Sequence, residues 1–313
     1  MAGAIAGTAP LDVDKHDYDK PSILTVTVNN SCNFNCNHCY LQYTGEKSYL
    51  NHSIAKKIAD SSFKHIALVG AEPLFNQEHV DKTSEFIYFL KEHDKTVSLI
   101  TNGSNLNLLD KKTAEKLAFI DVSFDGGQNT YSINRMGDYN NIIKNVRSLE
   151  NNVQINALHT LHSKNINNIN DMLSINKDAL FKTMLFSPYL KTNNDGTNSV
   201  GAIHIQQLIE LLNNSNFKQE HNAVLMIDSH YLSQEKLKAN DCKNLLEKNN
   251  LLEKTAFFPE SSLDMGIMRV SYDGLVMTPE DSLHTKTYSK ALSINSQTNL
   301  DEIFSSFIDT FKR

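Results

Sequence analysis

Short apolar strands alternate with amphipathic helices along most of the chain, and this alternation constrains the fold more than any other feature of the sequence. Alternating β and α elements place the strands in parallel within one sheet and the helices outside it. The alternation runs from about residue 22 to about residue 230. The predicted strands are Ile23–Val28, His65–Gly70, Thr96–Ile100, Ile120–Phe124, Val153–Leu158 and Thr183–Ser187.

The segments between these strands carry apolar residues at helical spacing. Six βα units favour a partial (β/α)6 barrel over a closed (β/α)8 barrel, so the predicted fold class is α/β. In such sheets the active site lies at the C-terminal ends of the strands. The predicted helices are Ser53–Ser62, His79–Leu90, Asp110–Leu117, Asn140–Leu149, Ile166–Ile175 and His204–Leu212.

The pattern changes after about residue 231. Asp273-Gly274 stands between two short apolar runs, Ile267–Val270 and Leu275–Met277, and Asp-Gly in that setting predicts a hairpin. Predicted helices flank it at Leu232–Glu253 and Leu300–Phe311. We therefore expect three regions: a flexible N-terminal arm (1–21), a barrel (22–231) and a small α+β extension (232–313).

Charge and hydropathy narrow the possible partners. The 313 residues carry a net charge of −6, which gives no basic footprint for nucleic acid. No apolar run reaches the roughly 18 residues that a membrane-spanning helix needs. The first residues, Met1–Pro10, lack the basic start of a signal peptide. We therefore expect a cytoplasmic protein whose partners include neither nucleic acid nor a membrane.

Three of the four cysteines, Cys32, Cys36 and Cys39, follow the first predicted strand directly. Cysteines clustered this tightly indicate a metal site instead of disulfides. The C-x3-C-x2-C spacing offers three thiolates, which can bind three irons of a [4Fe–4S] cluster and leave the fourth iron open. The alternative is structural zinc, which needs four ligands and would have to recruit His38 or Cys242.

This loop resembles the C-x3-C-x-φ-C signature of the radical S-adenosylmethionine (SAM) superfamily, with His38 at the usually aromatic position. The resemblance implies that His38 contacts the cofactor. The resemblance covers the barrel, about residues 22–230. It implies a radical SAM barrel with one [4Fe–4S] cluster whose open iron binds SAM. It further implies reductive cleavage of SAM to a 5′-deoxyadenosyl radical. Such chemistry implies a reducing partner such as flavodoxin or ferredoxin.

A second motif of the superfamily follows at the end of the second predicted strand. Gly70-Ala71-Glu72-Pro73 resembles Gly-Gly-Glu-Pro, with Ala71 in place of the second glycine. Small residues let the backbone approach a ligand closely. The resemblance implies that backbone carbonyls here, together with the Glu72 side chain, accept hydrogen bonds from the SAM ammonium. Taken alone, the motif also fits a plain strand-to-helix turn.

Two further strand ends continue the series. Thr101-Asn102-Gly103 is similar to a Thr-Asn-Gly segment near the cofactor, and Ser123-Phe124-Asp125-Gly126 resembles Ser-Leu-Asp-Gly. The resemblance assigns Ser123 and Asp125 to the amino group and ribose of SAM. Arg135 lies in a segment similar to Arg-x-x-Gly-x-aromatic, and its planar fork suits the SAM carboxylate. Each residue alone also fits a turn or a surface polar group, but the ordered series identifies the superfamily.

The C-terminal hairpin resembles that of SPASM and twitch extensions, whose cysteines hold auxiliary clusters. A cysteine expected near Thr278–Glu280 is missing, and only Cys242 remains. One thiolate cannot hold a cluster, and an isolated cysteine is usually a small buried apolar residue. We therefore predict a single cluster and a degenerate extension that serves as a lid or a substrate wall.

The substrate stays open at this point. SPASM-like tails are common among enzymes that modify ribosomally made peptides, so peptide modification is our first hypothesis. The second is the same chemistry on a nucleoside, sugar or amino acid, and the third is a metal-binding protein without catalysis. The candidates for contacting the substrate are His159, Tyr189 and Tyr272. His159 also fits a structural, hydrogen-bonded histidine.

Overall fold

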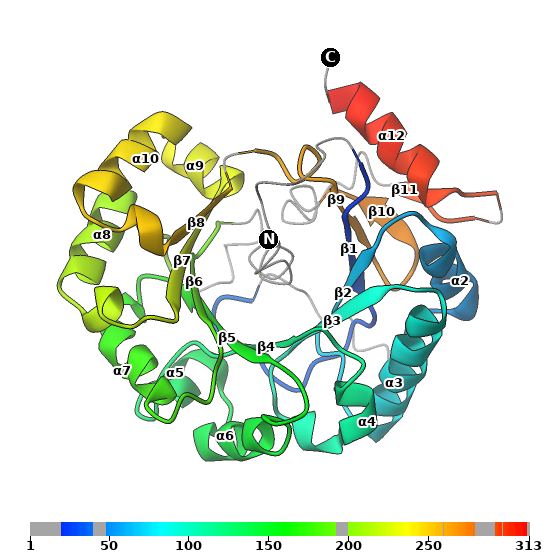
Figure 1. Cartoon of the computed structure of the whole chain (residues 1–313), viewed down its shortest axis with the longest axis horizontal. Helices are drawn as coiled ribbons and strands as arrows, with labels where there is room; N and C mark the ends of the chain where they lie inside the picture. Colours follow the sequence, from blue (N-terminus) through cyan, green and yellow to red (C-terminus); the bar gives the residue numbers. More distant parts are fainter. Residues whose placement is uncertain are drawn as a thin grey trace.

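The computed structural model describes residues 20–39, 48–191, 200–258, 260–278, 292–295 and 297–311. Residues 1–19 of the predicted N-terminal arm lie outside this range. The strands line the inside of a ring and the helices surround it (Figure 1). The strands are β1 (Ile23–Thr27), β2 (His65–Val69), β3 (Thr96–Thr101), β4 (Ile120–Ser123), β5 (Ile155–Leu161), β6 (Met184–Pro188), β7 (Ala223–Asp228), β8 (Thr255–Phe258), β9 (Ile267–Val270), β10 (Leu275–Met277) and β11 (Leu292–Ser293).

Side-chain caps define several helix starts. The side chains of Asn51, Asn76 and Asp138 accept backbone N–H bonds from the first turns of α2, α3 and α6. The helices are α2 (His52–Asp60), α3 (Gln77–Glu92), α4 (Lys111–Ala114), α5 (Tyr131–Arg135), α6 (Tyr139–Arg147), α7 (Ile169–Leu173), α8 (Ile205–Asn213), α9 (Ser229–Glu235), α10 (Ala239–Lys248) and α12 (Leu300–Phe311), with short 3-10 turns η2 (Leu106–Leu108), η3 (Ile166–Asn168), η4 (Ser174–Asn176), η5 (Asn216–Lys218) and η6 (Leu252–Lys254). None of the helices in the described ranges is both long and apolar enough to cross a bilayer.

All described strands belong to one sheet in the order β11-β10-β9-β1-β2-β3-β4-β5-β6-β7-β8. Pairing is parallel from β9 through β8, while β10 and β11 add an antiparallel edge. No pairing joins β8 to β9 among the described residues, so the sheet curves without closing. The predicted α/β fold with an open, barrel-like sheet is therefore confirmed.

The sheet extends beyond the six predicted strands. All six are present, but β7 and β8 continue the parallel series, and β9 pairs with β1 on the other side. The sequence pattern predicted one helix over residues 232–253, whereas Lys236 takes a left-handed conformation (φ 53°) that ends α9 before α10 begins. The strands of the C-terminal extension thus belong to the barrel sheet. The division of the chain into folding units at residue 231 stays a prediction.

The two faces of the sheet differ in their neighbours. Leu24 and Val26 of β1 point outward and pack in the large core beneath the helices. Ile23, Ala67 and Leu185 point inward and belong to a second apolar cluster inside the barrel. The side chains of this inner cluster fill part of the barrel interior. The polar residues described below gather at the carboxyl ends of the strands.

Asp121 of β4 is a fully buried carboxyl group on the inner face. Its Oδ1 accepts a hydrogen bond from Asn156 Nδ2 at 2.8 Å, and its Oδ2 has no hydrogen-bond partner. Burial raises the pKa of Asp121 to about 8, although the Asn156 hydrogen bond acts in the opposite direction. An aspartate in the unfolded chain ionises near pH ~4. The folded state therefore binds one more proton than the unfolded state between about pH 4 and about pH 8, and it loses stability as the pH rises through that window.

We expect Asp121→Asn to remove this loss, because the amide cannot ionise. The metal-free variant should match or exceed the melting temperature of the unmodified chain at pH 8, and its advantage should shrink toward pH 5. Thermal denaturation of both proteins between pH 5 and pH 8 measures the difference. Asp178→Asn, at an exposed position, is the control and should leave the shape of the curve unchanged. Parallel curves for Asp121→Asn and the unmodified chain would contradict the expectation.

Candidate active site

The cysteine loop follows the carboxyl end of β1. Cys36 is buried, Cys32 and Cys39 are partly exposed, and none of the cysteines is in a disulfide. Nowhere in the described ranges do three His, Cys, Asp or Glu side chains gather as ligands of one metal ion. Three cysteine side chains in one loop can each bind a different iron of a cubane, so this donor set fits a [4Fe–4S] cluster.

Cys36 is protonated in the metal-free protein. Burial raises its pKa to about 11, and the neighbouring Arg135 charge only partly opposes this. Its Sγ lies 4.0 Å from the backbone oxygen of Arg135, to which the thiol donates. Metal ligation requires the thiolate, so binding of iron releases this proton.

Asn102 of the Thr-Asn-Gly segment contacts the cysteine loop directly. Its Nδ2 lies 3.9 Å from Cys32 Sγ and donates to Asn33 Oδ1 at 2.9 Å. Its Oδ1 accepts the backbone N–H of Ser104, which fixes the orientation of the amide. A hydrogen bond to a ligating sulfur is one of the ways by which proteins tune iron–sulfur clusters. The structure therefore brings Asn102 to the first cysteine, while its role toward a cofactor stays a prediction.

The Glu72 carboxylate is satisfied within the protein. Oε1 accepts from the Thr101 hydroxyl at 2.5 Å and from Leu74 N at 2.9 Å, and Oε2 accepts from Asn102 N at 2.7 Å. Burial raises the pKa of Glu72 despite these three hydrogen bonds. The predicted contact of this side chain with the SAM ammonium stays a prediction. Glu72 and Thr101 join the ends of β2 and β3.

Gly70 and Ala71 keep partly exposed backbone at the same edge. A Cβ at Gly70 would lie 2.9 Å from Asn29 Oδ1, so the glycine makes room for this side chain. Asn29 Nδ2 in turn donates to the Glu72 carbonyl at 2.6 Å. The sequence analysis did not identify Asn29 as a member of the site, although a polar residue at the end of an apolar strand is a usable signal.

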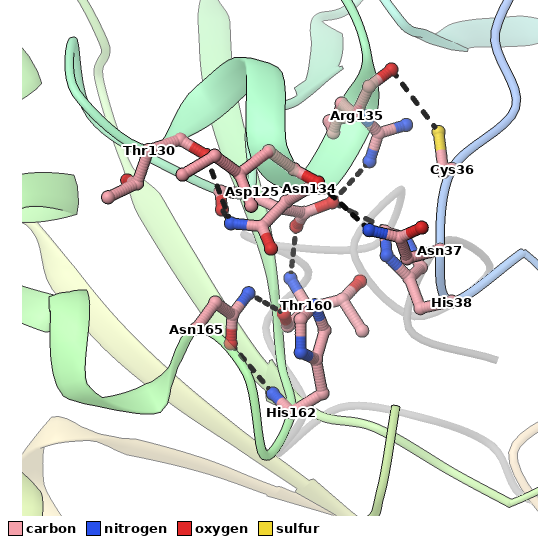
Figure 2. Close-up of polar contacts among 11 residues, drawn as sticks. Cys36, Asn37, His38, Asp125, Thr130, Asn134, Arg135, Thr160, His162 and Asn165 are labelled. Carbon is pink, nitrogen blue, oxygen red and sulfur yellow. Dashed lines mark hydrogen bonds and ion pairs between the residues drawn. The ribbon is translucent and has the colours of Figure 1, made fainter. Parts of the chain in front are cut away.

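The Asp125 side chain has three partners at this edge (Figure 2). Oδ1 accepts from Thr160 N at 2.5 Å, Oδ2 accepts from Arg135 Nη1 at 2.5 Å, and His38 Nε2 lies 3.3 Å from Oδ2. Complete burial alone would raise the pKa of Asp125, but the charges of Arg135 and His38 and the Thr160 hydrogen bond outweigh burial and lower it. Asp125 is therefore an ionised carboxylate with both oxygens engaged. Its expected contact with SAM stays a prediction.

Arg135 keeps one donor unused after pairing with Asp125. Its Nε is buried and has no hydrogen-bond partner. Burial acts to lower the pKa of the guanidinium. The Coulomb interactions with Cys36 and Asp125 outweigh burial, so the pKa of Arg135 lies above its usual value. Ser123 ends β4 two residues before Asp125 and is partly exposed. The structure thus leaves Arg135 and Ser123 able to contact a ligand.

Buried polar atoms without a hydrogen-bond partner concentrate around this cluster. Native interiors contain few such atoms, and each costs about 1–3 kcal/mol. A polar ligand that reaches these atoms would supply the missing partners, so these residues fit SAM. The atoms are His38 Nδ1, Tyr131 Oη, Asn134 Oδ1, Arg135 Nε and His162 Nε2.

His162 is a site residue that the sequence analysis missed. It follows β5 directly, is completely buried, and its ring centroid lies 5.5 Å from that of His38. Its Nδ1 accepts the backbone N–H of Lys164 at 3.2 Å, so the hydrogen of the neutral ring is on Nε2. Burial lowers the pKa of His162 to about 4. Its place after a barrel strand was the signal that could have identified it.

The two predicted tyrosines lie on the site side of the barrel. Tyr272, in the β9–β10 hairpin, accepts a 3.4 Å hydrogen bond from Asn30 Nδ2 beside the cysteine loop. Tyr189 follows β6 and is buried. It lies an even number of positions after the inward-facing Leu185, which places the two residues on the same face of the sheet. Their contact with a substrate stays a prediction.

His159 lies on the outer face of the sheet. It pairs in register with Phe186, and the two rings stack with centroids 4.4 Å apart. Phe186 packs edge-to-face on Phe217 of η5, so this side of β5 faces the outer helices. Burial lowers the pKa of His159 to about 4, and neither ring nitrogen has a hydrogen-bond partner at normal geometry. The structure thus gives His159 a packing contact on this face, and its predicted catalytic role stays a prediction.

We expect His159→Phe to stabilise the metal-free protein by about 1–2 kcal/mol, because it removes two unpaired buried nitrogens and keeps the ring stack. Denaturant unfolding measures the change, with the exposed His221→Phe as a control that should give no gain. A destabilised His159→Phe that also fails to bind iron would instead return His159 to the site.

The comparisons with known proteins agree with this geometry. Residues 26–175 match the family model described as the Radical SAM superfamily. No curated protein matches the sequence. Among solved structures, Streptococcus suis SuiB bound to S-adenosylmethionine is similar with a TM-score of 0.64 and 14% identity, over 94% of this chain and 68% of that chain. SuiB bound to its precursor peptide SuiA gives 0.63 and 14%, over 96% and 68%.

A third solved structure is anSMEcpe with bound AdoMet and the Kp18Cys peptide. It has a TM-score of 0.59 and 17% identity, over 91% of this chain and 80% of that chain. At such identities the likeness establishes the fold. The matched segment, residues 26–175, is the part of this chain that resembles the Radical SAM superfamily, whose members use a [4Fe–4S] cluster and SAM.

Proposed function

We propose that Cys32, Cys36 and Cys39 hold one [4Fe–4S] cluster, which cleaves SAM to a 5′-deoxyadenosyl radical that abstracts hydrogen from a carbon of a peptide substrate. One observation carries this proposal: three thiols stand in one loop beside a concentration of unpartnered buried polar atoms at the carboxyl edge of the sheet. The three thiols are suitable ligands for the cluster, and the unpartnered polar atoms are suitable hydrogen-bond partners for SAM.

The surrounding residues are candidates for binding different groups of SAM. The Arg135 guanidinium, with its unused Nε, is our candidate for the carboxylate of SAM. The partly exposed backbone at Gly70 and Ala71 is the candidate for its ammonium. The Ser123 hydroxyl, at the end of β4, suits the amino group or ribose. Asn102 donates toward Cys32 and so stabilises the thiolate form of that ligand.

A peptide substrate is the version of this function that we favour. Two structures of similar fold, SuiB and anSMEcpe, hold peptides. Among the described strands, β8 and β9 are not hydrogen-bonded to each other, so the sheet is open on that side. An open side suits an extended ligand such as a peptide. Tyr189 and Tyr272 are our candidates for contacting it. The alternative is a small molecule such as a nucleoside, sugar or amino acid, bound by the same residues.

The partners follow from the chemistry. Electrons must come from a reductant such as flavodoxin or ferredoxin. Three reduced thiols suit the cytoplasm, and the net charge of −6 disfavours nucleic acid as a ligand. The small C-terminal extension, which we liken to a degenerate SPASM or twitch module, would form a wall of the substrate site through the β9–β10 hairpin. Glu280 and Ala291 of the motifs behind that likeness lie outside the described residues.

We expect Cys36→Ala to reduce iron to traces after anaerobic reconstitution and to abolish SAM cleavage, because a cubane held by two thiolates is not retained. Cys242→Ala is the matched control, because Cys242 is fully buried in the outer core. It should keep about four irons and an EPR signal that changes when SAM is added. Normal iron content in Cys36→Ala, or loss of about four irons in Cys242→Ala, would refute the single-cluster assignment.

We expect Arg135→Lys to weaken SAM binding roughly tenfold while the iron content stays normal, because lysine keeps the charge beside Asp125 but loses the planar fork. Equilibrium binding of SAM to the reconstituted, unreduced protein measures the effect. Arg147→Lys, at an exposed Arg–Asp pair, is the control. An unchanged dissociation constant for Arg135→Lys would show that the SAM carboxylate binds elsewhere.

A further inference from the structure

We infer that His38 is a positioning residue, which holds the second half of the cysteine loop to the ends of β4 and β5 by donating a hydrogen bond from Nε2 to Asp125 Oδ2, 3.3 Å away. The inference rests on the proposed function, because the loop that it positions is the one that would hold the cluster. It assigns the His38 side chain a bond within the protein, at a position where the resembled signature has an aromatic residue.

Three separate elements meet at the Asp125 carboxylate. The cysteine loop contributes His38, helix α5 contributes Arg135, and strand β5 contributes the Thr160 backbone N–H (Figure 2). The side chain of Asp125 is fully buried and that of His38 is 12% exposed. A hydrogen bond to a carboxylate in such surroundings is stronger than one in water.

The direction of the His38 bond follows from its partner. An ionised carboxylate only accepts, so His38 Nε2 carries the hydrogen and donates it. The neutral imidazole is sufficient for this bond. A phenylalanine at the same position would keep the ring but could not donate. The bond therefore depends on the choice of histidine at position 38.

The residues on either side of His38 are held to the same unit. Asn37 Nδ2 donates to the Ile133 carbonyl at 2.9 Å, and Cys36 Sγ faces the Arg135 carbonyl at 4.0 Å. Helix α5 has only five residues, and Asn134 Nδ2 ties it to the Asp125 carbonyl at 2.8 Å. Asp125 thus holds the stretch between the second and third cysteines twice, directly through His38 and indirectly through α5.

The first cysteine has a different support. Cys32 is contacted by Asn102, which belongs to the end of β3. Loss of the His38 bond should therefore move Cys36 and Cys39 relative to Cys32 and leave the rest of the barrel in place. A displacement of two of the three cysteine ligands should change the EPR spectrum of a bound cluster and its rate of iron loss. It should change the free energy of unfolding much less.

Three substitutions separate the hydrogen bond from the ring. His38→Gln places an amide N–H near the position of Nε2 and can still reach Asp125. His38→Asn is too short to do so, and His38→Phe keeps the ring without a donor. His159→Phe is the matched control, because it replaces a buried histidine on the outer face of the sheet.

Two measurements apply to each variant. The first is the alkylation rate of Cys36 and Cys39 in the metal-free protein, followed by peptide mass spectrometry. The second is the EPR spectrum and the rate of iron loss to a chelator after anaerobic reconstitution. In His38→Phe and His38→Asn, we expect the alkylation of Cys36 and Cys39 and the loss of iron to be roughly tenfold faster than in the unmodified chain. A tenfold change in rate is what the loss of one hydrogen bond to a charged group can produce. His38→Gln and the control should stay near the unmodified chain.

Equal rates in all variants would overturn the inference, and so would a His38→Gln that behaves like His38→Phe, since the ring would then matter and the bond would not. If His38→Phe does not fold, the comparison of His38→Gln with His38→Asn decides alone. The alkylation arm needs no iron. A chain that binds no iron would therefore refute the proposed function and still leave the His38 bond tested.

Discussion

The buried carboxylate of Asp125 is the interaction on which the site depends. A lone ionised carboxylate in a protein interior costs far more free energy than a domain can spare, so its partners are obligatory. Here they come from the end of β5, from helix α5 and from the cysteine loop. The ends of two strands and the loop after a third are thus held in one arrangement by a single charge. Removing Arg135 would leave the Asp125 charge unmatched, and removing either other partner would leave the carboxylate with one contact fewer.

Glu72 has the same role at a neighbouring pair of strands, where it joins the ends of β2 and β3. With both carboxylates engaged inside the protein, the groups left for a ligand at this edge are mostly donors and backbone. The unpaired Arg135 Nε, Tyr131 Oη and His162 Nε2 belong to this set. Such an edge suits an anionic or hydrogen-bond-accepting group, and the SAM carboxylate is one.

The sequence was enough to predict the six strands β1 to β6, the hairpin at Asp273-Gly274 and the cysteine loop, because each rests on local periodicity or spacing. Strands β7 and β8 were missed because their apolar runs, Ala223–Ile227 and Ala256–Phe258, do not alternate with polar residues, and periodicity alone does not distinguish such a run from a buried helix. The outward direction of His159 and the internal bonds of Asp125 were missed for another reason. They depend on which face of a strand meets which neighbour, and a motif match carries no information about that.

The pairing of β1 with β9 has a consequence for biosynthesis. Ile23 begins the strand that leads into the cysteine loop, and its partner Ile267 leaves the ribosome only after most of the chain has been made. Contacts between such distant residues form late, because the intervening loop must first be closed. Tyr272, which reaches Asn30 beside the loop, arrives later still. The cysteine loop therefore gains its support from β9 and the β9–β10 hairpin only after both segments have been synthesised.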